Sequence, residues 1–346
     1  MSAMALPASN DAGAREFLKS QNWPTGLIEM LIQGFLKTPI RFIIVDNSGS
    51  MASSDGQQII NQGNQGRFVK CSRWTELTGA LRFHAALAEA ARAPTEFRLL
   101  NNALPILLGV GDDNGQKLHQ LFDLFDQSPS GGTPLCRHIG EIVAQITALA
   151  PQLYANNQKA VLIIASDGEA SDGDVSRAME PLKNLPVWVV IRLCTGEERI
   201  CEYWSNIDKQ LEIDMDVLDD LEEEAKEIHK VNDWITYGEP LHRLREFGII
   251  LKDMDMLDET ALSPDQMRSV MAVLLTGGPA SEVPHPAMDW SAFTGFVKPI
   301  NDTLPKTWSP MTKSMQTWVL MSQLQRKYGP GGGGASSGGG GCCVIS

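Results

Sequence analysis

One short stretch constrains the fold more than any other part of the chain, the segment PIRFIIVDNSGSM at residues 39–51. It opens with an apolar run from Ile40 to Val45, in which β-branched and aromatic residues dominate and whose length suits a fully buried strand. The run stops at Asp46, where a polar loop begins. In a parallel sheet such loops lie side by side at the strand ends, and ligand sites form in the crevice outside them.

The loop presents three oxygen-bearing side chains on alternate residues, Asp46, Ser48 and Ser50, with Gly49 between the two hydroxyls. Alternate spacing on an extended or turning loop can aim all three oxygens at one point. A small hard cation such as Mg2+ prefers six oxygen ligands at about 2.0–2.1 Å. Because three ligands do not fill six places, further oxygens must come from elsewhere in the chain.

Two later segments offer such oxygens. The segment SGGTP at 130–134 contributes the hydroxyl of Thr133, and a second buried-strand pattern at 161–168 ends in Asp167 and a glycine. Thr133 also stands at the start of a helix expected over 134–149, where its hydroxyl could serve as a cap instead of a ligand. The sequence leaves that choice open.

The five positions Asp46, Ser48, Ser50, Thr133 and Asp167 resemble, in order and local setting, the metal-ion-dependent adhesion site of von Willebrand factor type A domains, which include the integrin I domain. The resemblance covers roughly residues 39–233. It implies a doubly wound, mostly parallel α/β sheet flanked by helices. It further implies Mg2+ or Mn2+ held directly by the three hydroxyls, with the two aspartates acting directly or through water.

The order of apolar patterns along 39–233 favours the same architecture, because expected strands alternate with expected helices. Helical spacing of apolar residues before it predicts an N-terminal helical extension at 1–38, and residues 234–328 predict a helical C-terminal extension. One helix of that extension is expected after the capping box at Ser263, and another after Ser309-Pro310, with Met311, Met315, Trp318 and Val319 on one side.

Two segments of the middle region are unusual. The insertion 52–72 is rich in Gly, Gln, Asn and Ser and predicts a hairpin, which could shape partner choice, cover the metal loop or be a plain surface loop. The run 212–227 holds nine acids and one lysine, and a solvated face is expected there, with binding of a basic partner as the alternative.

The last residues, 329–346, read as a flexible Gly-rich tether that ends in Cys342-Cys343-Val344-Ile345-Ser346. The final four fit a C-a-a-X box with serine last, which is typical of farnesylation, here of Cys343. Cys342 is a natural second acylation site for a palmitoyl group, since one lipid binds a membrane only marginally. This tail predicts a eukaryotic protein anchored on the cytoplasmic face of a membrane.

Charge and composition argue against a nucleic-acid-binding protein and against a secreted one. The formal net charge is −13 and no basic cluster appears, which argues against nucleic-acid binding. The first residues show neither the charged region nor the apolar run of a secretory signal, and we expect the cysteines at 71, 136, 194 and 201 to be reduced.

Together these features favour a membrane-tethered intracellular protein-binding module that is not an enzyme, whose metal recognises an Asp or Glu of a protein partner. A Mg2+-dependent hydrolase is one alternative, but its usual D-x-D motif would need a carboxylate where Ser48 stands, and no Walker loop or nucleophile elbow is found. The other alternative is a metal-independent scaffold, the role of the proteasomal ubiquitin receptor among intracellular relatives of this family.

Overall fold

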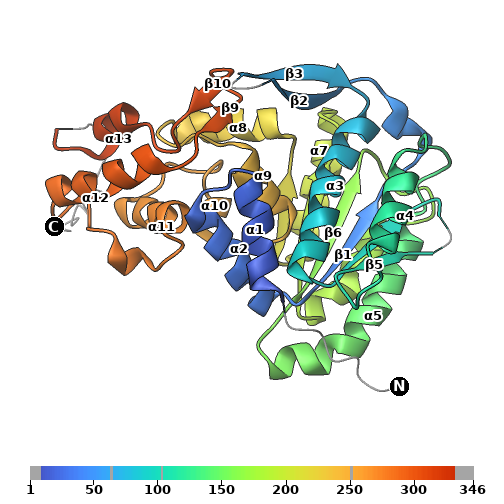
Figure 1. Ribbon diagram of the computed structural model, residues 1–346. Coiled ribbons are helices and arrows are strands. Elements are labelled where there is room, and N and C mark those ends of the chain that lie inside the picture. Colours follow the sequence, from blue (N-terminus) through green and yellow to red (C-terminus); the bar gives the residue numbers. More distant parts are fainter. Residues whose placement is uncertain (1–8, 63–64, 103, 250–251, 332–346) are drawn as a thin grey trace, which may run out of the picture.

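The computed structural model describes residues 9–62, 65–102, 104–249 and 252–331. At its centre is a six-stranded sheet in the order β5-β4-β1-β6-β7-β8 (Figure 1). All neighbouring strands are parallel except β5, which runs antiparallel to β4. The mostly parallel α/β sheet flanked by helices is thereby confirmed. The strands are β1 (Ile40–Val45), β4 (Thr95–Leu99), β5 (Ile106–Leu108), β6 (Ala160–Ser166), β7 (Val187–Leu193) and β8 (Met215–Leu218).

Helices cover both faces of the sheet, so β1 is buried along its whole length. Phe42 and Ile44 enter the apolar core on one face, whereas Ile43 and Val45 enter the core on the other. A strand that is covered on both sides reads as a continuous apolar run, which explains the pattern in the sequence. One face is covered by α5 (Leu135–Ala155), α6 (Val175–Met179), η2 (Glu180–Asn184) and α7 (Glu198–Leu211), and the other by α3 (Arg73–Ala91) and α4 (Gln116–Phe125).

A third apolar core joins the two ends of the chain, and we call it the terminal core. Residues 11–37 and 234–328 supply most of it, and it rests on the end of α3 through Leu87 and Ala91. At Gly26 two helices approach so closely that a Cβ would lie 2.3 Å from the Val273 carbonyl oxygen. The helices around this core are α1 (Asp11–Ser20), α2 (Thr25–Lys37), α8 (Leu221–Val231), α9 (Glu239–Glu246), α10 (Lys252–Asp255), α11 (Pro264–Leu275), η3 (Ala280–Glu282), α12 (Trp290–Thr303) and α13 (Met321–Tyr328).

Two antiparallel hairpins lie outside the central sheet. The hairpin expected in the 52–72 insertion is confirmed as β2 (Gly56–Gln62) and β3 (Gln65–Cys71), which follows the short helix η1 (Gly49–Ala52). It reaches across the top of the molecule in Figure 1 toward a second hairpin, β9 (Thr307–Ser309) and β10 (Ser314–Gln316). There the ring of Phe68 meets Trp308 edge-on, with centroids 4.8 Å apart. The insertion thus connects the loop after β1 to the C-terminal extension.

The prediction of a helix after Ser309-Pro310 is wrong, because this segment forms the β9–β10 hairpin. Lys313 adopts a positive φ of 51°, and its backbone N–H donates to the Ser309 carbonyl, which closes a turn. Met311 and Met315 had the spacing of one helical face, yet both are exposed. Helices α4, α9 and α12 were not anticipated from the sequence.

The acidic run 212–227 is not a uniformly solvated face, so that expectation is also wrong. The Glu224 side chain is buried and accepts a bond from Arg245 at 2.6 Å, and Asp216 lies 3.2 Å from the same guanidinium. Arg245 comes from α9. Packing of the C-terminal extension against this run therefore converts surface carboxylates into buried ion pairs.

Candidate metal site

Three loops meet at the carboxyl edge of the sheet. β1 and β6 end side by side, because Val45 pairs with Ala165 and the Asp46 N–H donates to the Ala165 carbonyl at 2.9 Å. The loop at 130–133 lies against the loop after β1, since the Gly49 N–H donates to the Gly131 carbonyl at 3.1 Å. The three segments that carry the candidate ligands are thus neighbours in the fold.

Four of the five candidate ligands form one cluster of oxygens. Ser48 Oγ lies 2.9 Å from Ser50 Oγ, and Ser50 Oγ donates to Asp167 Oδ1 at 2.8 Å. Asp46 Oδ1 accepts the backbone N–H of Ser48 at 2.9 Å, which holds the turn that brings the serines toward β6. Carboxylate and hydroxyl oxygens are the donors that hard divalent cations select, so the residues fit Mg2+ or Mn2+.

Asp46 is fully buried at the base of this cluster. Its Oδ2 accepts a hydrogen bond from Ser166 Oγ at 2.6 Å, a contact that the sequence analysis missed. Burial raises the pKa of Asp46, although the hydrogen bonds from Ser166 and Ser48 act in the opposite direction. A buried carboxylate is costly unless a cation or further donors compensate it, and a metal ion beside Asp46 would do so.

Thr133 lies in the loop at 130–133, where its backbone forms hydrogen bonds with Ser171. The Ser171 N–H donates to the Thr133 carbonyl at 2.9 Å, and the Thr133 N–H donates to Ser171 Oγ at 3.2 Å. Helix α5 begins at Leu135, and its first free N–H groups, those of Cys136 and Arg137, donate to the two carboxylate oxygens of Asp172 at 2.9 Å each. The alternative role of Thr133 as the helix cap is therefore wrong, because Pro134 occupies the capping position.

The most informative residue of the site was missed by sequence reasoning. Arg73, the first residue of α3, donates from Nη1 to Asp167 Oδ2 at 2.9 Å. Its Nε and Nη2 bind the two oxygens of Asp55 at 2.8 and 2.6 Å, and Nη2 also binds Glu197 at 2.9 Å. No spacing or motif relates Arg73 to the loop after β1 or to Asp167, so only the folded chain brings them together.

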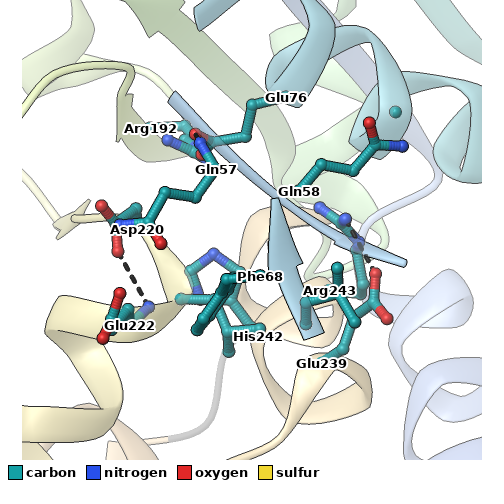
Figure 2. Close-up of a pocket in the computed structure, with 13 residues that line it drawn as sticks. Gln57, Gln58, Phe68, Glu76, Arg192, Asp220, Glu222, Glu239, His242 and Arg243 are labelled. Atoms are coloured by element: carbon teal, nitrogen blue, oxygen red, sulfur yellow. Dashed lines mark hydrogen bonds and ion pairs between the residues drawn. The ribbon is translucent and has the colours of Figure 1, made fainter. Parts of the chain in front are cut away.

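A separate cavity of about 130 Å3 lies beneath the β2–β3 hairpin. Figure 2 shows side chains from the hairpin, α3, β7, α8 and α9 around it. The wall holds two ion pairs, Arg192 with Glu76 at 2.5 Å and Arg243 with Glu239 at 3.0 Å. Behind the wall, Arg192 also reaches the buried Glu246 of α9 at 3.2 Å. The Arg192–Glu246 pair thus joins the sheet to the C-terminal extension beside the cavity.

Comparison of the chain with protein-family models and with curated proteins finds no match. Among the described residues, no helix is both long and apolar enough to cross a membrane. The two cysteines of the expected lipidation motif, Cys342 and Cys343, lie outside the described residues.

Proposed function

We propose that this chain is a protein-binding module of the von Willebrand factor type A kind, which holds Mg2+ or Mn2+ and recognises an acidic group of a protein partner. The ligands would be Asp46, Ser48, Ser50, Thr133 and Asp167. The observation that carries the proposal is the convergence of Asp46, Ser48, Ser50 and Asp167 in one oxygen cluster at the sheet edge.

The chemistry of the donors favours an acidic partner. Hydroxyl groups are neutral and donate little charge, so a divalent ion held mainly by serine and threonine keeps a strong attraction for an anion. Mg2+ also requires about six oxygen ligands. If the two aspartates act through water, three hydroxyls and two waters leave one position open. A carboxylate from a partner's Asp or Glu would fill the remaining position and balance the charge.

A pull-down from native cytosol and membranes tests this function, with Mg2+ or with EDTA present. Wild type is compared with Thr133→Ala, which removes one hydroxyl but no helix cap, and with Thr133→Ser, which keeps the hydroxyl. We expect a partner that is retained only with Mg2+, by wild type and Thr133→Ser, and lost by Thr133→Ala and Asp46→Ala.

A partner that all variants retain in EDTA would contradict the proposal and favour the metal-independent scaffold. Attention would then move to the β2–β3 hairpin and the C-terminal extension. If a purified preparation instead shows phosphate-ester hydrolysis that Asp46→Ala abolishes, the hydrolase alternative would replace the binding function.

The proposal includes a lipid anchor on Cys343, assisted by a palmitoyl group on Cys342. In eukaryotic cells, Cys343→Ser should move the protein from the membrane to the soluble fraction, because Cys343 would carry the prenyl group. Cys342→Ser should shift only part of it, since a single lipid gives weak and reversible anchoring. If the membrane-bound share of Cys343→Ser equals that of wild type, the result would argue against the anchor.

A further inference from the structure

The guanidinium of Arg73 lies beside the candidate metal cluster in a buried setting. The side chains of Arg73 and Asp167 are 7% and 0% exposed, whereas those of its other partners, Asp55 and Glu197, are 53% and 54% exposed. Water therefore screens the two outer carboxylates, while the attraction between Arg73 and Asp167 is screened much less. The positive charge of Arg73 therefore acts mainly on the candidate ligand Asp167.

Three separate elements hold this charge in place. Asp55 lies directly before the β2–β3 hairpin, Asp167 follows β6 and Glu197 stands at the start of α7. Hydrogen bonds from Arg73 to Asp55, with those to Glu197 and Asp167, raise the pKa of Arg73, so the group stays charged at any physiological pH. Arg73 therefore acts as a permanent cation of the site.

This cation changes the charge balance that a divalent ion would meet. Asp46 and Asp167 offer two negative charges, but Arg73 offsets one of them through direct contact with Asp167. A nearby positive charge weakens the binding of a second cation at the same carboxylate. With a divalent ion bound, the ion, Arg73, Asp46 and Asp167 together carry one excess positive charge, which attracts an anion because the exposed Asp55 and Glu197 are screened by water.

We infer that Arg73 makes metal loading depend on an acidic partner. It lowers the affinity of the free protein for Mg2+, and it raises the affinity of the loaded site for a carboxylate. The inference rests on the proposed function, because it requires Mg2+ at the cluster. It adds that the site remains largely empty until an acidic group arrives with the ion.

Calorimetric titration of the full chain with Mg2+ tests the inference, with sodium chloride or sodium acetate at equal ionic strength. Acetate serves as the probe for the partner's carboxylate. Arg73→Gln should bind Mg2+ about tenfold more tightly than wild type in chloride, since the opposing charge is gone. Acetate should tighten Mg2+ binding several-fold in wild type and much less in Arg73→Gln.

Two further variants guard against an effect of misfolding. The double variant Asp55→Asn/Glu197→Gln keeps Arg73 but removes its exposed counter-charges, so Mg2+ should bind about threefold more weakly, the opposite sign. Arg82→Gln is the matched control, because Arg82 lies on the same helix and pairs with the exposed Asp126. Its Mg2+ affinity should equal that of wild type.

The outcomes separate this inference from the proposed function. Equal Mg2+ affinity of wild type and Arg73→Gln would overturn the inference and leave the metal site intact. An absence of Mg2+ binding in every variant would overturn both. Binding by Arg73→Gln alone would support the role of Arg73 strongly, since the wild-type cluster would then be held empty by its own cation.

Discussion

At the scale of single residues, Arg41 shows how this protein buries charge. It lies on β1, fully buried, and donates to the Phe247 carbonyl at 3.0 Å and to the Thr38 carbonyl at 2.9 Å. Its guanidinium also stacks over the ring of Phe247, 4.3 Å from the centroid. Burial lowers the pKa of Arg41 to about 9. The sequence shows an arginine inside an apolar run, but its partner lies more than two hundred residues away.

A second residue, Asp219, gives a pH-dependent prediction. Burial raises the pKa of Asp219 from 3.8 to about 6. The folded state therefore favours the protonated carboxyl, and this stabilisation is present at low pH and lost as pH rises through about 6. Asp219→Asn does not ionise, so its unfolding free energy relative to wild type should rise by about 1 kcal/mol between pH 5 and pH 8, allowing for partial exposure.

Urea unfolding of both proteins at the two pH values measures this difference. Asp126→Asn, a change on the surface, serves as the comparison for general effects of charge removal. A relative stability of Asp219→Asn that stays flat or falls with rising pH would show that Asp219 is not held in a desolvated position.

At the scale of elements, helix α3 illustrates what a local pattern does not reveal. Three of its side chains each bind a different neighbour. Arg73 binds Asp167 in the oxygen cluster, Glu76 binds Arg192 of β7, and His84 lies 3.2 Å from Glu246 of α9. The helix itself is evident from its alanine and leucine content, but these three contacts depend on where β6, β7 and α9 pack.

Elements with strong local signals were predicted well. β1 and β6 are short apolar runs that end in polar loops, and α11 begins at a complete capping box on Ser263. The segment after Ser309 failed because Met311 and Met315 have helical spacing but form no buried face. There the pairing of β10 with β9 overrides the periodicity, as long-range packing often does.

At the scale of the whole molecule, the terminal core makes the two ends of the chain depend on each other. Residues 11–37 and 234–328 pack together and against the end of α3. Expressed alone, the segment 39–233 would expose Leu87, Ala91 and Ile228 and would leave Arg41 without the Phe247 carbonyl. We expect this segment to lose its cooperative thermal transition and to bind a hydrophobic dye.

Circular dichroism during heating, together with dye fluorescence, checks this prediction. A chain that ends at residue 331 is the control, and it should melt at the same temperature as the full chain because it keeps the entire terminal core. A sharp transition of segment 39–233 near the temperature of the full chain would show that the sheet with its own helices is stable alone.

The fold class and the proximity of Asp46 to Asp167 follow from local sequence patterns. Runs such as Ile40–Val45 reveal buried strands locally, and parallel pairing then brings the loops that follow them to one edge, which places Asp46 near Asp167. The folded chain alone reveals that Arg73 pairs with Asp167, that Glu224 is buried and that both ends of the chain share a core. These contacts join segments far apart in the chain, and no local periodicity encodes which distant charges and surfaces meet.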